Sequence, residues 1–517
     1  MHNRGMVQVA VGVGPVSADD VVRVARDDAE VVLADDAIAA MAASRAHIES
    51  LAGNPAPAYG ISTGFGALAT RHIPHELRTR LQRSLIRSHA AGSGPEVERE
   101  VIRAMMLLRL STLATSRTGV RPQVAQAYAA LLSAGVTPVV YEYGSLGCSG
   151  DLAPLSHIAL AVMGEGHVRT AAGALVTAAD ALREHGLEPV TFAEKEGLAL
   201  INGTDGMLGQ LVLALADLDR LLALADIAAA MSVEGLLGTD RVFAPHLQAL
   251  RPQPGQALAA ANMTRMLAES PIVASHSGPD CPLVQDAYSL RCAPQVAGAV
   301  RDTVAHARNV ANWELASIVD NPVITDAGTV ESNGNFHGAP VAYVLDFLAI
   351  AVADLASISE RRTDRFLDAA RSRGLNPFLA DDPGVDSGHM IAQYTQAAIV
   401  SELKRLAQPA SVDSIPSSAM QEDHVSMGWS AARKLRKAID GLTRVLAIEI
   451  LTAARGIEMR APLRPAPGTA AVIAAVRDQV PGVGPDRYLA PEIDAVVQLA
   501  RDGSLVAAAE AVVGGLS

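Results

Sequence analysis

The chain has 517 residues, of which 50% are hydrophobic and only 3% are aromatic. This length is sufficient for a large buried core and predicts two or three domains. A formal net charge of −13 disfavours nucleic acid as a partner, because a binding face would have to overcome the overall repulsion.

Three features of the sequence indicate where in the cell the protein is expected: its cysteines, its N-terminus and its apolar segments. Cys148, Cys281 and Cys292 show neither metal-ligand spacing nor a disulfide framework, which favours a reducing cytoplasm. The N-terminus lacks a basic stretch followed by an apolar run, so we expect no signal peptide. Charged residues interrupt the longest apolar segments, which are therefore expected to be buried helices, and no membrane partner is predicted.

The first part of the chain predicts one short strand followed by helices. The strand is expected in the run MVQVAVGV, and the segment SADD that begins at Ser17 predicts a capped helix start. A loop rich in Pro and Gly follows, AGNPAPAYGISTGFG, and contains Tyr59. Its glycines permit a loop that folds tightly over a site, although a surface turn with a packed tyrosine has the same composition. Helices are expected again from about His75 to Ala134.

Residues 144–157, GSLGCSGDLAPLSH, carry the most informative chemistry in the chain. Glycine at position 150 leaves little in the way when its amide nitrogen attacks the carbonyl carbon of Cys148. Loss of one water closes a five-membered ring, and loss of a second water from Ser149 gives a 4-methylidene-imidazol-5-one, which is an electrophile. A glycine-rich turn before a helix is the plain alternative. The Gly-x-Ser-x-Gly pattern of a serine hydrolase does not fit this segment.

The residues after this tripeptide predict a helix. Asp151 is expected as its N-cap residue, and Pro154 is tolerated in its first turn. The positive end of the helix dipole would then favour negative charge on the ring.

From Asn202 onward the sequence predicts several unusually long helices, with loops around residues 251–287, 318–340 and 371–388. Over residues 425–457, apolar side chains recur at three- and four-residue steps, which predicts one helix of roughly 50 Å at 1.5 Å per residue. Such helices need partners along their whole length, so we expect a bundle extended by other subunits. The predicted fold class is mainly α: a long-helix bundle domain at residues 203–517 and a smaller, mostly helical N-terminal domain at residues 1–202 that bears the tripeptide.

Polar candidates follow in two stretches. Asn202, in EGLALINGT, lies where an apolar run gives way to a new helix; its carboxamide can donate to an oxygen of the ring and can equally cap the helix. In residues 284–296, VQDAYSLRCAPQV, Tyr288 and Arg291 are one helical turn apart and can face one pocket. Arg291 could bind a carboxylate with its bidentate fork or form a surface ion pair.

These motifs, in this order, resemble those of the aromatic amino acid ammonia-lyases over roughly residues 10 to 460. The usual tripeptide of that family is Ala-Ser-Gly; here the first residue is Cys148, which contributes only its backbone to the ring. The resemblance implies a ring formed autocatalytically from Cys148, Ser149 and Gly150, with no nucleotide and no required metal. It also implies a mainly helical two-domain subunit that assembles as a homotetramer, with active sites that draw residues from several chains.

The resemblance implies roles for individual residues. Tyr59 would take the β-proton of the substrate, Tyr288 would contact the ring and assist the departing amine, and Gln285 would orient nearby groups. Asn202 would stabilise charge on the ring. Phe336, in SNGNFHG, would lie against the ring, with a buried structural phenylalanine as the alternative.

Two positions bear on substrate choice. The pair Ser88-His89 resembles family members that act on histidine and departs from the Phe-Leu and His-Leu pairs usual in members that act on phenylalanine and tyrosine. Glu422, in SSAMQEDHVSMGW, occupies the position that the histidine-acting members use near the imidazole. A carboxylate accepts a hydrogen bond from a ring N–H, whereas a phenyl ring would leave it unpaired. The predicted substrate-binding residues are therefore His89, Asn202, Arg291 and Glu422, although His89 alone fits a core histidine and Glu422 alone fits a helix-start acid.

The expected reaction is the non-oxidative deamination of L-histidine to trans-urocanate and ammonium, the first step of histidine degradation. The substrate's amine, or its imidazole ring, would add to the methylene carbon derived from Ser149. Three alternatives stay open: a tyrosine ammonia-lyase or tyrosine aminomutase of the same family, a cysteine hydrolase that uses Cys148 with a histidine base, and an inactive scaffold with the family's fold.

Overall fold

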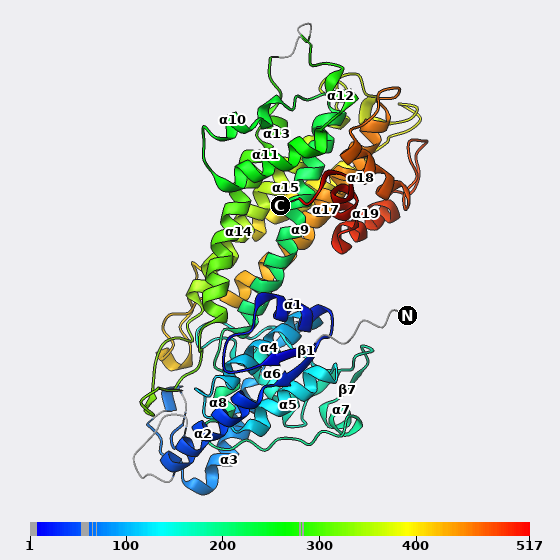
Figure 1. Cartoon of the computed structure of the whole chain (residues 1–517). Helices are drawn as coiled ribbons and strands as arrows, with labels where there is room; N and C mark the ends of the chain where they lie inside the picture. Colours follow the sequence, from blue (N-terminus) through cyan, green and yellow to red (C-terminus); the bar gives the residue numbers. More distant parts are fainter. Residues whose placement is uncertain are drawn as a thin grey trace. The chain divides into compact units, whose positions relative to one another are not determined.

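The computed structural model describes residues 8–52, 61–64, 66–68, 70–278, 281 and 284–516. Within these ranges the chain forms twenty α-helices and only short strands, so the predicted mainly α fold is confirmed (Figure 1). Tyr59 lies outside the described residues.

The chain forms two compact units, each built from three segments of sequence. The first unit comprises Met1–Leu213, Arg308–Asp346 and Pro409–Arg433, and the second comprises Ala214–Ala307, Phe347–Gln408 and Lys434–Ser517. The units therefore alternate along the chain, whereas a boundary after residue 202 would divide it once. That boundary stays a prediction.

Four long helices contribute residues to both units. They are α9 (Asp205–Gly235), α14 (Ala293–Leu315), α15 (Ala339–Leu367) and α17 (Gly428–Glu458) (Figure 1). The long helix predicted over residues 425–457 is confirmed as α17, and its apolar Leu435, Leu442 and Leu446 are buried. The three- and four-residue repeat in the sequence therefore marks the buried face of this helix.

The helix α15 has an unusual distribution of apolar residues. In the part of the chain that the structure describes, it is the one helix long and apolar enough to cross a membrane by length and composition, and the most apolar stretch is 61% buried inside the protein, as in a core helix. Tyr343, Phe347 and Ile350 nevertheless remain exposed. Steps of four and three residues place these three side chains on one face of the helix.

The first unit packs short helices around α4 (Arg99–Ala114), which is buried over most of its length and contacts α1 (Ala18–Arg26), α2 (Asp35–Ala52) and α5 (Pro122–Ser133). Ser17 and Asp20 form a capping box at the start of α1, as predicted. The other helices of this unit are α3 (Arg78–His89), α6 (Leu152–Val162), α7 (Ala178–Glu184) and α8 (Glu196–Ala199).

The strands of the first unit form four small sheets. β1 (Gln8–Val11) and β2 (Glu30–Leu33) pair in parallel, with Val9 opposite Val31. The remaining pairs are antiparallel: β3 (Ser93–Glu96) with β5 (Tyr141–Tyr143), β4 (Thr137–Pro138) with β6 (His167–Arg169), β6 with β7 (Leu175–Thr177), and β8 (Val323–Ile324) with β9 (Val330–Glu331).

The second unit adds shorter helices to its parts of the long ones. These are α10 (Pro245–Gln248), α11 (Pro254–Leu267), α12 (Pro271–Ala274), α13 (Tyr288–Arg291), α16 (Met390–Leu406), α18 (Pro467–Arg477), α19 (Ala490–Asp502) and α20 (Ser504–Val513). The prediction of a loop over residues 251–287 is wrong where α11 lies. Pro254 occupies the first turn of α11, where its missing N–H costs no hydrogen bond, so a proline that suggests a loop begins a helix.

Candidate active site

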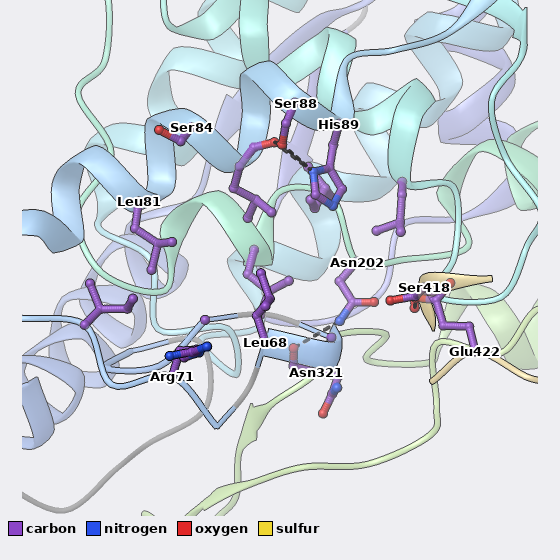
Figure 2. Close-up of a pocket in the computed structure, with 18 residues that line it drawn as sticks. Leu68, Arg71, Leu81, Ser84, Ser88, His89, Asn202, Asn321, Ser418 and Glu422 are labelled. Atoms are coloured by element: carbon purple, nitrogen blue, oxygen red, sulfur yellow. Dashed lines mark hydrogen bonds between the residues drawn. The ribbon is translucent and has the colours of Figure 1, made fainter. Parts of the chain in front are cut away.

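A cavity of ≈ 620 Å³ lies in the first unit and is lined by Ser149, His89, Asn202 and Glu422 (Figure 2). Its volume is typical of a small-molecule site. The four side chains come from the end of α3, the loop before α6, the turn after α8 and the loop before α17. The structure thus brings together four predicted site residues that are far apart in the sequence.

The backbone of the tripeptide is tightly packed against Gly203. Gly147 and Gly150 have φ of +67° and +78°, a left-handed conformation that side chains disfavour. A Cβ on Gly150 would lie 2.1 Å from the carbonyl oxygen of Gly203. The same carbonyl accepts a hydrogen bond of 2.7 Å from the Asp151 N–H. Position 150 therefore has no room for a side chain.

Asp151 is the N-cap residue of α6, as predicted, but its side chain makes no cap hydrogen bond to that helix. Instead, its Oδ2 accepts from the N–H groups of Gly206 and Met207, both at 2.9 Å, in the first turn of α9. Its Oδ1 accepts from Ser145 Oγ at 2.8 Å. Burial raises the pKa of Asp151 to about 7, although these hydrogen bonds oppose the rise.

Glu422 lies directly against the tripeptide. Its Oε1 accepts a hydrogen bond from Ser149 Oγ at 2.9 Å. Its Oε2 accepts from Cys148 Sγ at 3.0 Å and from Ser417 Oγ at 2.9 Å. Backbone hydrogen bonds in both directions between Ser417 and Glu422 fix the loop that carries them.

The thiol of Cys148 acts here as a hydrogen-bond donor. The side chain is 6% exposed, and burial, helped by the hydrogen bond to Glu422, raises the pKa of the thiol to about 12. The group therefore stays protonated at neutral pH. This state is the opposite of the thiolate that a cysteine nucleophile requires.

His89 lines the cavity, and its hydrogen bonds define the tautomer of its ring. Its Nδ1 lies 2.9 Å from the carbonyl oxygen of Leu85, which can only accept, so Nδ1 carries the proton. Burial lowers the pKa of His89, although the Leu85 carbonyl and the charge of Glu422 oppose this. The ring is therefore neutral at pH 7, and Nε2 is free to accept a hydrogen bond.

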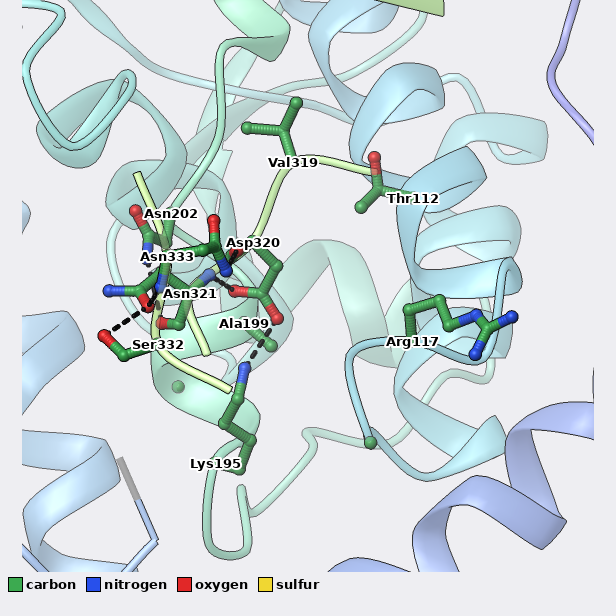
Figure 3. Close-up of polar contacts among 12 residues, drawn as sticks. Thr112, Arg117, Lys195, Ala199, Asn202, Val319, Asp320, Asn321, Ser332 and Asn333 are labelled. Atoms are coloured by element: carbon green, nitrogen blue, oxygen red, sulfur yellow. Dashed lines mark hydrogen bonds and ion pairs between the residues drawn. The ribbon is translucent and has the colours of Figure 1, made fainter. Parts of the chain in front are cut away.

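Asn202 belongs to a cluster of polar contacts that includes Asn321 and Asp320 (Figure 3). Its Nδ2 donates to the carbonyl oxygen of Asn321 at 3.0 Å. Asp320 Oδ1 accepts from the Asn321 N–H at 2.8 Å, and Asp320 Oδ2 pairs with Lys195 Nζ at 2.5 Å. Both charged side chains are fully buried. The Asn202 Oδ1 is buried without a hydrogen-bond partner among the described residues, and so is available to a ligand.

Four other predicted residues that the structure describes do not line this cavity. Phe336 is half-buried in the turn before α15 and is not among the described residues that line this cavity. Gln285, Tyr288 and Arg291 belong to the second unit, where Gln285 and Arg291 line a cavity of ≈ 530 Å³. The guanidinium carbon of Arg291 lies 4.6 Å from the centre of the Tyr288 ring, a cation–π contact.

The site predicted from the sequence did not include Ser417, Lys195, Asp320 or Asn321. Ser417 lies five residues before Glu422 in SSAMQED. This short separation in the sequence could have suggested that its hydroxyl contacts the carboxylate. Lys195 and Asp320 are 125 residues apart and carry no local pattern that connects them.

Comparisons with known proteins agree along the whole chain. The family model described as aromatic amino acid lyase matches residues 16–478. A histidine ammonia-lyase of Streptomyces avermitilis is 66% identical over 513 residues, which cover 99% of this chain and 100% of the relative. Among solved structures, tyrosine aminomutase from Streptomyces globisporus is similar with a TM-score of 0.92 and 37% identity, covering 98% of this chain and 99% of that one. Histidine ammonia-lyase from Trypanosoma cruzi is similar with a TM-score of 0.90 and 38% identity, covering 98% and 96%.

Proposed function

The chain belongs to the aromatic amino acid lyase family, and from this premise we propose that it is a histidine ammonia-lyase, which converts L-histidine to trans-urocanate and ammonium. The observation that supports L-histidine as the substrate is the placement of His89 and Glu422 in one cavity with Ser149. The reaction breaks the C–N bond and one β C–H bond and forms a C=C bond. No electrons leave the substrate, so the chemistry needs no nucleotide.

We propose that Cys148, Ser149 and Gly150 cyclise into a 4-methylidene-imidazol-5-one. Family membership supports this, since the family model spans the tripeptide. The ring supplies an electron-poor carbon that helps the α-amine to leave. We propose that the carboxamide of Asn202 donates to an oxygen of the ring and stabilises the charge that builds there. Its Oδ1, which is buried and without a partner among the described residues, would accept from a donor of the substrate. A requirement for metal is not part of the proposal.

Glu422 and His89 would select the imidazole. The carboxylate of Glu422 accepts the ring N–H of the substrate and stabilises positive charge on the imidazole. The neutral His89 offers its Nε2 as a second acceptor. A phenyl group would leave both acceptors unpaired in the cavity, which costs binding free energy.

The remaining roles come from family membership. We propose that Tyr59 removes the β-proton, Arg291 binds the substrate carboxylate, and Tyr288 assists the departing amine. Gln285 would orient its neighbours and Phe336 would pack near the ring. The half-buried Arg291 has an Nε without a partner among the described residues, which supports a role in binding an anion.

The alternatives are less well supported. Tyrosine would place a phenol, which is a poor partner for two acceptors, against Glu422 and His89. A cysteine hydrolase is disfavoured because the thiol of Cys148 stays protonated. An inactive scaffold would not need four predicted site residues in one cavity.

We further propose a homotetramer with shared active sites, located in the cytoplasm. The exposed apolar face of α15, formed by Tyr343, Phe347 and Ile350, supports contact with another subunit. The three free thiols suit a reducing compartment. Nucleic acid and membrane are not expected partners.

Intact mass and ultraviolet spectra together test the proposal. The purified protein should weigh less than its sequence by two waters, and Ser149→Ala should have its encoded mass and no activity. Incubation with L-histidine should produce the absorbance of urocanate. Incubation with L-tyrosine or L-phenylalanine should produce no absorbance of coumarate or cinnamate. A full encoded mass would refute the ring, and coumarate in place of urocanate would refute the substrate.

A further inference from the structure

We propose that Cys148, together with Ser417, is a positioning residue for Glu422: the two side chains hold one oxygen of the carboxylate so that the other faces the substrate after the ring has formed. The inference rests on the proposed function, because it concerns how the carboxylate that selects the imidazole is oriented. It gives a purpose to the one position of the tripeptide where this chain departs from Ala-Ser-Gly.

The two oxygens of Glu422 are held differently. Oε2 has two side-chain donors, Cys148 Sγ at 3.0 Å and Ser417 Oγ at 2.9 Å. Oε1 has Ser149 Oγ at 2.9 Å. Hydrogen bonds to a carboxylate are charge-assisted, so the pair on Oε2 strongly restricts rotation of the group.

Formation of the ring removes only one of these donors. The first water carries away the Cys148 carbonyl oxygen, with the amide hydrogens of Ser149 and Gly150, while an N–C bond and a C=N bond form. The second water carries away Ser149 Oγ with its hydrogen and the hydrogen on Ser149 Cα, and a Cα=Cβ bond forms. The hydroxyl that occupied Glu422 Oε1 is therefore gone, while the thiol and the Ser417 hydroxyl remain.

The freed Oε1 is thus the oxygen that accepts the imidazole N–H. An oriented carboxylate loses little freedom when the substrate binds, which favours affinity and selectivity. Alanine at position 148 has no donor, so an Ala-Ser-Gly chain would hold Oε2 through one side chain fewer. The buried, protonated thiol of Cys148 can keep this contact throughout the neutral pH range.

Two competitive inhibitors separate positioning from general damage. Trans-urocanate carries the imidazole, and trans-cinnamate has a phenyl ring in its place. In Cys148→Ala we expect the inhibition constant of urocanate to rise about five-fold, which is the loss of one modest hydrogen bond, and that of cinnamate to stay unchanged. Cys148→Ser keeps a donor and should restore the parent value for urocanate.

Ser417→Ala tests the second donor and should also weaken urocanate selectively. Ser414→Ala is the matched control, because the Ser414 hydroxyl accepts from the Val425 N–H in the same loop and does not contact Glu422. In Ser414→Ala, the ratio of the inhibition constants of urocanate and cinnamate should equal that of the parent.

Intact mass and parent turnover complete the test. Cys148→Ala should lack two waters, as the parent does; a full encoded mass would assign Cys148 to ring formation and overturn the inference. Equal weakening of both inhibitors, or no change in Cys148→Ala, would also overturn it. If the parent protein fails to deaminate L-histidine, the proposed function is wrong. This turnover measurement is separate from the ratio of inhibition constants, so the two failures can be distinguished.

Discussion

Individual ionisable groups in this protein are governed by burial. Burial favours the proton-bound form of the Cys148 thiol and of the Asp151 carboxyl, and both pKa values rise. Burial also favours the neutral form of a histidine, but here the neutral form is the deprotonated one, so the pKa falls. His389, which is 2% exposed and lies 3.1 Å from Thr452 Oγ1 through its Nδ1, has its pKa lowered to about 3 by burial and then by neighbouring arginines.

His389 should make the protein less stable in acid. Its pKa is about 3 in the folded chain and about 6.5 in the unfolded chain, so the unfolded state binds the extra proton between these values. The stabilising contribution is complete above pH 6.5 and falls by about 1.4 kcal/mol per pH unit as the pH decreases towards 3. Urea unfolding of His389→Gln between pH 6.5 and 4 should show a flatter loss of stability than the parent. His185→Gln, at an exposed histidine, is the control and should follow the parent.

Among the structural elements, the segment around residues 319–321 links the core of the first unit to the cavity. Lys195 and Asp320 form a fully buried ion pair, and the Asn321 that follows accepts the hydrogen bond from Asn202. Burial lowers the pKa of Lys195, and the charge of Asp320 opposes this change. The charge of Asp320 therefore offsets part of the desolvation that disfavours the charged lysine.

Lys195→Met should destabilise the protein by about 3–5 kcal/mol, because it leaves the Asp320 carboxylate buried without its partner. The measurement is the free energy of urea unfolding at neutral pH. Arg183→Met removes an exposed ion pair with Asp180 and should change the free energy of unfolding far less. Equal effects of the two substitutions would contradict this account of the cluster.

The sequence predicted elements where the signal is local and periodic. The repeat of apolar residues gave α17, and Ser17 gave the start of α1, because these patterns depend on residues within one or two turns. The sequence placed Asp151 at the N-cap of α6 but did not show that its carboxylate binds the first turn of α9, because α9 begins 54 residues later and only tertiary packing brings the two together. The cavity residues His89 and Glu422 lie in recognisable motifs, whereas no local pattern connects Lys195 with Asp320, which is 125 residues away.

At the scale of the whole molecule, the sharing of active sites between subunits can be tested by mixing inactive variants. Ser149→Ala and Arg291→Ala should each be inactive alone. If one site takes Ser149 and Arg291 from different chains, random co-assembly of the two variants should restore about one quarter of the parent activity. Activity is measured as urocanate formation by the co-expressed, co-purified protein.

The matched control combines Ser149→Ala with Asn202→Ala. Both residues line one cavity of a single chain, so no co-assembled subunit has an intact cavity and no activity should return. Recovery in this control, or none in the first mixture, would contradict the shared sites.

The crowding around Gly150 separates the need for glycine at this position from the ability of the tripeptide to form a ring. A Cβ on Gly150 would meet the backbone of Gly203, and a Cβ on Gly203 would meet the guanidinium of Arg109. Glycine at position 150 is thus demanded by interlocking shapes, whether or not any covalent rearrangement takes place. A related protein without catalytic activity would therefore still need glycine at this position. Only the residue at position 149 would indicate whether the electrophile can form.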